Sequence, residues 1–375
     1  MKNRLAFLGL VSILPLILAS VAIASTTWYV DGVNGNDGND CKTRQSACKT
    51  IGHAILLASA GDTIGVGPAT YTENLTIGFS LKLIGSGAKT TIIDGGGVNA
   101  VVTISTTTAH VTLSGVTIQH GAPGIFNSGS LMAIRSAVIG NTAASGPNSY
   151  GGGIWNFGIL TISNSTVASN SAICPTCVAA WGGGIDNRGT ATINNSTISG
   201  NKASAGCTTG EFGCVAQGGG IHNKGTLTIS SSTISGNMVS LPNCQSRCGL
   251  GGGGIFNLDA TTTIQNSIVA NNSLGNCGGL MTSNGYNMSS DGSCIFNGPG
   301  DLNKTDPKLG PLQSNGGPTQ TQALLPGSPA IDAGNPNGCT DGNGHLLKTD
   351  QRGAPRPDKE DTGGCDMGAY ERQSD

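Results

Sequence analysis

The stretch that decides the fold is GGGIWNFGILTISNSTVASN at residues 151–170. It recurs as GGGIDNRGTATINNSTISGN at 182–201 and as GGGIHNKGTLTISSSTISGN at 218–237, with looser copies at 124–141 and 252–272. The motif keeps its length while the segments between the copies vary, so the five leading isoleucines lie 29, 31, 36 and 34 residues apart. A constant core with variable insertions is typical of a solenoid that carries loops on one side.

Each copy contains short alternating runs of apolar residues. In the first copy, Ile154 is followed by Leu160 and Ile162 and then by Val167, with Asn and Gly between the runs. This period of two predicts three short strands per coil, and no run has the helical period. Stacked coils would place each strand about 4.8 Å from its equivalent. The repeats therefore predict an all-β chain that forms a three-sheet parallel β-helix.

Two sets of asparagines recur at fixed positions in the motif. A stacked Asn can occupy a left-handed corner and bond to the amide of the next coil. The alternatives are metal binding or glycan attachment, since the NST sequences at 164–166 and 195–197 match the acceptor pattern. Because NST is part of the repeat itself, we expect structural ladders. The two sets are Asn127, Asn156, Asn187, Asn223 and Asn257, and Asn141, Asn170, Asn201, Asn237 and Asn272.

The composition excludes several classes of function. Glycine makes up 61 of 375 residues, more than twice the usual frequency, whereas charged residues are only 11% and the formal net charge is −2. So little charge predicts no binding of nucleic acid, because there is no basic field to release counterions. The many Ile, Val and Thr residues argue against disorder.

The N-terminus predicts export. Lys2 and Arg4 precede an apolar run that ends in the small-residue site Ala22-Ile23-Ala24, so residues 1–24 are interpreted as a signal peptide. No later apolar stretch approaches the ~20 residues needed to span a bilayer, so we expect no transmembrane span in the mature chain. A secreted protein, extracellular or associated with the cell surface, is the expectation.

Twelve cysteines agree with an oxidising compartment. Their even number predicts disulfides, although sequence alone does not determine which cysteines pair. A redox or zinc site at the CPTC sequence of 174–177 is the alternative, but the sequence offers no second ligand pair. The cysteines fall as close neighbours: Cys41 and Cys48, Cys174 and Cys177, Cys207 and Cys214, Cys244 and Cys248, Cys277 and Cys294, and Cys339 and Cys365.

The composition along the chain suggests four segments. The signal peptide (1–24) is followed by an N-terminal segment (25–61) in which residues 49–59 have the spacing of a short capping helix. The β-helix then covers 62–300. Nine of the fifteen prolines lie after residue 298, and the Pro/Gly-rich region at 301–375 is expected to close the last coil. Its charged residues are expected to hold turns by hydrogen bonds: Asp332, Asp350, Arg352, Arg356, Asp366 and Glu371.

Three stretches carry a resemblance to known families. WYVDGVNGNDGNDC, CKTIGHAI and GDTIGVGPATYTENLTI resemble the amino end of secreted right-handed parallel β-helix proteins of the pectin-lyase-like superfamily. The GGGI-x-N repeats are similar to those of polymorphic outer-membrane-type proteins. The tail, with SNGGPTQTQALLPGSPAIDAG, DQRGAPRP and CDMGAYE, resembles the choice-of-anchor Q domain. The resemblance implies a right-handed β-helix at a cell surface, but such folds support many functions, so function must be argued from a site.

The candidate site is an outward stripe on the GGGI-x-N strands. The residue after each isoleucine should point away from the core, which places Phe126, Trp155, Asp186, His222 and Phe256 in one column. Two residues further along the strands come Phe157, Arg188, Lys224 and Leu258. Aromatic rings beside charged groups suit a polysaccharide or cell-surface glycan. The predicted ligand-binding residues are Trp155, Asp186, His222 and Phe256.

Two functions remain open at this stripe. The first is a structural, adhesive or glycan-contacting protein without catalysis. The second is a polysaccharide lyase or glycoside hydrolase, with Asp186, Arg188, His222 and Lys224 as catalytic candidates. A hydrolase needs paired carboxylates, and Asp186 is the only acid on the stripe. No cofactor is expected. Ca²⁺ at the oxygen-rich segment 31–40 is the one candidate, but its spacing departs from the Ca²⁺-loop pattern, so a turn is preferred.

Overall fold

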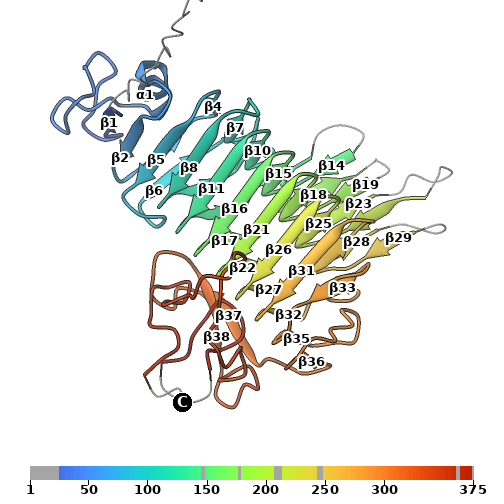
Figure 1. Ribbon diagram of the computed structural model, residues 1–375. Helices are drawn as coiled ribbons and strands as arrows, with labels where there is room; N and C mark the ends of the chain where they lie inside the picture. The colour runs from blue at the N-terminus through green and yellow to red at the C-terminus, as the bar shows by residue number, and fades with distance from the viewer. Residues whose placement is uncertain are drawn as a thin grey trace, which may run out of the picture.

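The computed structural model describes residues 25–144, 148–175, 179–206, 213–242, 248–359 and 364–373. These residues form a right-handed parallel β-helix, in which three long sheets run side by side along one axis (Figure 1). The predicted fold class is therefore confirmed. The predicted signal peptide at 1–24 lies outside the described residues.

Successive coils contribute one strand to each of the three sheets, which we call A, B and C. Sheet A contains β1 (Thr27–Val30), β2 (Thr63–Val66), β5 (Leu81–Gly85), β8 (His110–Ser114), β11 (Ser130–Ile134), β16 (Ile159–Ser163), β21 (Thr190–Asn194), β26 (Thr226–Ser230), β31 (Thr261–Gln265) and β34 (Thr282–Ser283). Sheet B contains β3 (Ala69–Thr72), β6 (Thr91–Asp94), β9 (Thr117–Gln119), β12 (Ala137–Ile139), β17 (Thr166–Ala168), β22 (Thr197–Ser199), β27 (Thr233–Ser235), β32 (Ile268–Ala270), β35 (Met288–Ser289) and β36 (Leu302–Asn303). Sheet C contains β4 (Leu75–Ile77), β7 (Val102–Ile104), β10 (Ile125–Asn127), β15 (Ile154–Asn156), β20 (Ile185–Asn187), β25 (Ile221–Asn223), β30 (Ile255–Asn257) and β33 (Cys277–Gly278).

The core is a column of stacked aliphatic side chains. The five leading isoleucines of the repeat pair in register from coil to coil and are fully buried: Ile125, Ile154, Ile185, Ile221 and Ile255. Matching columns from sheets A and B face the same interior. Each coil alone has too little apolar surface to fold, so the stack is the unit of stability.

Polar ladders line the corners of the coils. Both predicted asparagine ladders are present, because the side-chain amide of each Asn donates to the amide oxygen of its equivalent on the next coil. A serine ladder that the sequence analysis missed runs beside them: Ser136, Ser165, Ser196, Ser232 and Ser267. The left-handed corners lie elsewhere, at residues that include Arg135, Asn164 and Asn195. Asn195 is buried, which argues against a glycan on it.

A short helix covers the N-terminal end of the solenoid, as predicted. Helix α1 (Ile51–Leu57) begins after Thr50, whose side chain accepts from the His53 N–H. Its buried residues Ile51, Ala54 and Ile55 pack into the core, so the first coil is not left open. Carboxylates of the segment 31–40 accept local N–H and hydroxyl groups, Asp31 from Val33 and Asn34, and Asp37 from Lys49 and Thr50. These hydrogen bonds support the interpretation of the segment as a turn rather than as a Ca²⁺-binding loop.

The variable insertions form a second layer rather than irregular loops. Two four-stranded parallel sheets, D and E, stack beside sheet C and are visible at the right of Figure 1. Sheet D contains β13 (Thr142–Ala143), β18 (Ser171–Cys174), β23 (Lys202–Ala205) and β28 (Met238–Ser240); sheet E contains β14 (Asn148–Tyr150), β19 (Ala179–Trp181), β24 (Val215–Gln217) and β29 (Gly249–Gly251). Their own small core consists mainly of alanines.

The C-terminal region lies along the side of the solenoid, which corrects the expectation that it closes the last coil. After the antiparallel pair β37 (Leu309–Gln313) and β38 (Thr321–Leu324), it crosses the outer face of sheet B (Figure 1). Gln351 donates to Thr166 and accepts from Thr197, which belong to neighbouring coils. The Ala369 N–H donates to Thr233 on the next coil. Threonine hydroxyls on sheet B therefore hold the tail across several coils.

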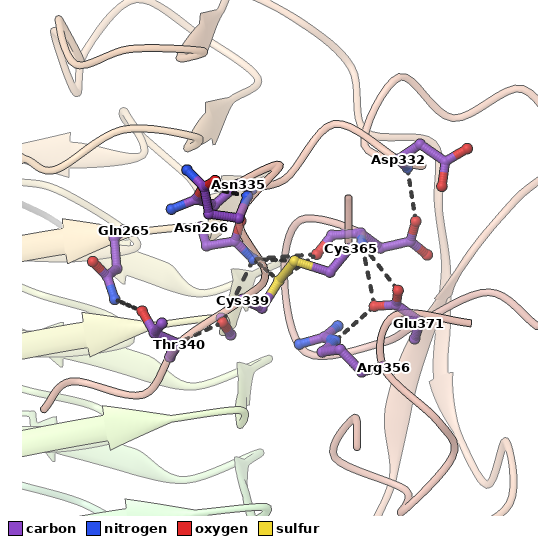
Figure 2. Close-up of a disulfide and its surroundings, with 12 residues drawn as sticks. Gln265, Asn266, Asp332, Asn335, Cys339, Thr340, Arg356, Cys365 and Glu371 are labelled. Atoms are coloured by element: carbon purple, nitrogen blue, oxygen red, sulfur yellow. Dashed lines mark hydrogen bonds and ion pairs between the residues drawn. A yellow bond between two sulfur atoms is a disulfide. The ribbon is translucent and has the colours of Figure 1, made fainter. Parts of the chain in front are cut away.

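Charged tail residues hold its turns, as predicted. Asp350 accepts from Arg352, and Asp366 accepts from the Asp332 N–H. Figure 2 shows Asp332 near the Cys339–Cys365 disulfide. The Asn266 side chain, on the solenoid, donates to the Asp366 carbonyl and to the Cys339 sulfur. Hydrogen bonds from Gln265 and Asn266 thus join the tail to the coil, and the disulfide links two segments of the tail.

A buried contact between an arginine and a carboxyl group lies at the centre of this network. The Arg356 Nε lies 2.6 Å from the Glu371 Oε2, and both side chains are fully buried (Figure 2). Burial raises the pKa of Glu371 from its ordinary 4.5 to about 8, although the guanidinium of Arg356 opposes the shift. The folded protein then holds this proton more tightly than the unfolded chain.

We expect the free energy of unfolding to fall as the pH rises from about 4.5 to about 8, because the unfolded chain loses the Glu371 proton near pH 4.5 whereas the folded protein keeps it up to about pH 8. Glu371→Gln keeps the shape and removes the titration, so its stability should change less over the same range. Guanidinium unfolding at several pH values tests this. Parallel pH curves for the two proteins would contradict it.

Three disulfides are described, and each joins cysteines that are close in sequence: Cys41–Cys48, Cys277–Cys294 and Cys339–Cys365. Cys174, Cys214 and Cys248 are also disulfide-bonded. Their neighbours Cys177, Cys207 and Cys244 lie outside the described residues. The loop-stapling interpretation is confirmed for the three described pairs.

Candidate functional site

The predicted stripe exists as one column on sheet C. Strand register places Phe126 beside Trp155, Trp155 beside Asp186, Asp186 beside His222 and His222 beside Phe256. The sequence therefore predicted the neighbours correctly. The expectation of a solvent-facing stripe was wrong at its centre, because Asp186 and His222 are both 0% exposed.

The second layer covers the centre of the stripe. Each strand of sheet E leads through the GGG sequence into a strand of sheet C, and the first glycine of the GGG has positive φ in every copy (54° at Gly151 and 65° at Gly182). A Cβ on the second glycine would meet backbone atoms of neighbouring coils, at 2.4 Å for Gly183. The triple glycine thus allows a sharp return of the chain that places sheet E over sheet C.

Aromatic rings from sheet E stack on the stripe. Tyr150 lies against Trp155 with ring centroids 5.0 Å apart, and it also stacks on Trp181 at 5.1 Å. The Trp181 and Phe256 rings each lie 6.0 Å from the imidazole of His222. Ring faces that would be needed for a sugar are therefore occupied by other rings. Tyr150 and Trp181 were missed from the sequence, yet each directly precedes a GGG, and that position is the signal that could have found them.

The charged groups of the stripe satisfy one another. Asp186 accepts from the Arg188 Nε at 2.9 Å and is bonded to the His222 Nδ1 at 2.6 Å. Because a carboxylate only accepts, His222 Nδ1 donates the proton in this hydrogen bond. The Arg188 guanidinium also lies over the Tyr150 ring, 4.3 Å from its centroid. This contact is a cation–π interaction between the two layers.

Two polar atoms in the interlayer have no hydrogen-bond partner among the described residues. They are the Trp155 Nε1 and the His222 Nε2, and both are buried. For the enzyme alternative, His222 Nε2 is the atom that would have to reach a substrate. It lies instead on a ring packed between Trp181 and Phe256.

The structure does not join Lys224 to this cluster. Its side chain is exposed, and no ion pair involving it is found among the described residues. A second carboxylate is also missing from the described contacts of Asp186. Among the described residues, the one grouping of potential metal ligands is Cys41, Cys48 and His53, and its two cysteines form a disulfide. The arrangement therefore offers neither a carboxylate pair nor a metal cluster.

Comparisons with solved structures find polysaccharide-active β-helix proteins at low identity. The pectate lyase Pel9A is 14% identical over 94% of this chain and 98% of its own, with a TM-score of 0.46. The carrot pectin methylesterase is 13% identical over 75% and 84%, with a TM-score of 0.42, and PemA from Erwinia chrysanthemi is 13% identical over 74% and 82%, with a TM-score of 0.36. No protein-family model and no curated protein sequence matches the chain. Identities and TM-scores of this size give no information about the activity of this chain. The fold is defined by the strand register itself.

Proposed function

We propose that this protein is a secreted or cell-surface β-helix with a structural or adhesive role, which contacts glycans without catalysis. One observation carries the proposal. The two strongest catalytic candidates, Asp186 and His222, are fully buried and bonded to each other beneath a second layer. The two side chains help to hold the layers together and do not face a substrate.

A glycan contact would use the edge of the stripe rather than its centre. Phe157 is 44% exposed and Ile159 is 53% exposed, and the Arg188 guanidinium lies 5.5 Å from the Phe157 ring centroid. Exposed apolar and aromatic side chains beside one cation suit the faces of sugar rings. In this proposal, Phe157 takes the role that the sequence analysis gave to Trp155.

Location outside the cytoplasm is part of the proposal. The described disulfides form and persist in oxidising compartments, which supports export. No helix in the described part of the chain is long and apolar enough to cross a bilayer. We propose that residues 301–375, whose motifs resemble the choice-of-anchor Q domain, stabilise the solenoid from its side.

A turnover assay tests the absence of catalysis. Purified protein is incubated with polyuronates and glucans, with and without Ca²⁺, and the products are followed as unsaturated and reducing ends. We expect no products above a heat-inactivated control. Turnover that is lost in both Asp186→Asn and Lys224→Ala would overturn the proposal in favour of a lyase or hydrolase.

A glycan array tests the adhesive role. We expect the wild-type protein to bind glycans on the array and Phe157→Ala to lose this binding, because the change removes the exposed ring without altering the core. Trp155→Ala should instead act mainly through stability, because its ring is packed against Tyr150. If the folded protein bound no glycan on the array, the proposed role would be structural only.

A further inference from the structure

A second site lies at the corner beyond sheet B, where the second layer begins. It is a cavity of about 400 Å³, which falls within the usual range for small-ligand pockets. It is lined by Gly97, Val98, His120, Gly121, Ala122, Gly140, Thr142 and Ala144. The repeat pattern gives no sign of this cavity, because His120 has no histidine at the equivalent position of the following coils.

His120 occupies a corner position at which glycine recurs in other coils. The register of sheet B aligns it with Gly140, Ser169, Gly200 and Gly236 on the following coils. All of these positions have a positive φ, and His120 has a φ of 51°. A left-handed backbone costs a residue with a Cβ roughly 1 kcal/mol, which glycine avoids. Strained side chains of this kind cluster at functional sites.

Asp94 holds the His120 ring in one orientation. The Asp94 Oδ2 lies 2.7 Å from His120 Nδ1 and accepts from the Gln119 side chain, while its Oδ1 accepts from the Gly96 N–H. Burial raises the pKa of Asp94, but these hydrogen bonds outweigh it and hold the pKa below its ordinary value. An ionised carboxylate only accepts, so Nδ1 donates to it. In the neutral ring, Nε2 is then left with a free lone pair.

The remaining lining is small and uncharged. His120 is its single titratable residue, and Thr142 adds one exposed hydroxyl. Val98, Ala122 and Ala144 offer apolar surface of the size of C–H groups. Apart from the His120 imidazole, the cavity lining therefore offers no charged side chain, but it offers a hydroxyl and apolar walls.

We propose that this cavity binds a neutral sugar residue, with one sugar hydroxyl donating to His120 Nε2 and the C–H face of the sugar lying against the apolar wall. The sugar is either free or the end of a neutral glycan. The site is separate from the stripe on sheet C and does not depend on whether that stripe contacts glycans.

The test is an NMR titration that follows the His120 ring signals and the backbone amide signals of Gly121 and Thr142, which remain in a His120 variant. The probes are glucose, galactose and mannose as free sugars, cellobiose as a chain end, and galacturonate as the charged comparison. We expect saturable shifts with at least one neutral probe and a weaker effect of galacturonate. Saturation by cellobiose alone would assign the site to chain ends. No saturable shift with any neutral probe, or tighter binding of galacturonate, would overturn the proposal.

Two variants make the test specific. His120→Gly places the residue type of the neighbouring coils at the corner, so it should keep or raise the melting temperature. It should weaken binding at least about tenfold, the cost of a lost hydrogen bond. The control is His345→Ala, which removes a histidine that also pairs with an aspartate, Asp341, but does not line the cavity. Unchanged binding by His120→Gly, or an equal loss in His345→Ala, would overturn the proposal.

Discussion

Replacing Asp186 by alanine should lower the free energy of unfolding by about 2–3 kcal/mol, because it leaves a buried imidazole without its partner. Arg188, which is partly exposed, can regain contact with water and so limits the loss. Guanidinium unfolding measures the change. Limited proteolysis should also cleave the second layer faster, since the Asp186 network helps to hold it in place.

The control for this prediction is Lys224→Ala, which removes an exposed cation of the same repeat and should change stability by less than about 0.5 kcal/mol. Asp186→Asn, which keeps the shape and two hydrogen-bonding atoms, should fall between the two. If Asp186→Ala were as stable as Lys224→Ala, the buried network would have no structural role.

Replacing Gly183 by alanine should have the larger effect, with a loss of about 3 kcal/mol or more. Its Cβ would lie 2.4 Å from the Gly219 carbonyl oxygen and from the backbone of Lys202. Backbone atoms in a stacked coil cannot rotate away as a side chain can. The yield of folded protein and its melting temperature measure the effect.

Gly65→Ala is the matched control, because its nearest neighbour would be 3.7 Å away, an ordinary contact. It should be nearly neutral, or even slightly stabilising through the unfolded state. If both variants melted at the wild-type temperature, the close approach of the GGG backbone to its neighbours would be refuted.

The repeats made the solenoid predictable because each contact of the core joins equivalent residues. Ile154 pairs with Ile185, and Asn156 donates to Asn187, so one alignment of the motif supplies the register of a whole sheet. The same alignment placed Asp186 beside His222. Whatever repeats along the axis can be derived from the sequence in this way.

The second layer was not predictable on those grounds. Its core consists of small residues such as Ala172, Ala203 and Ala216, whose weak apolar pattern looks like a loop. As a result, alternation along the strands correctly indicated that Asp186 points away from the core, but not that another sheet covers it. In a bare solenoid, a side chain that points away from the core is also exposed to solvent. Here the second layer covers some of the side chains that point away from the core.

The tail and the His120 corner escaped prediction for a different reason. Their contacts join residues far apart in sequence, such as Gln351 with Thr166, or depend on one residue that does not repeat, such as His120 at a corner that glycine, serine and asparagine occupy in the following coils. Neither produces a periodic signal. The tail's polar residues were correctly expected to hold turns, but the surface that the tail covers follows only from the structure.

The most direct measurement of the central claim, that the second layer buries the centre of the stripe, is chemical modification of histidines by diethylpyrocarbonate with peptide mapping. His110, His120 and His345 are exposed and serve as internal references, whereas His222 is fully buried. We expect the three exposed histidines to react in the folded protein and His222 to react only after unfolding. Modification of His222 at the rate of His110 would contradict it, and would return Asp186 and His222 to the surface as candidates for catalysis.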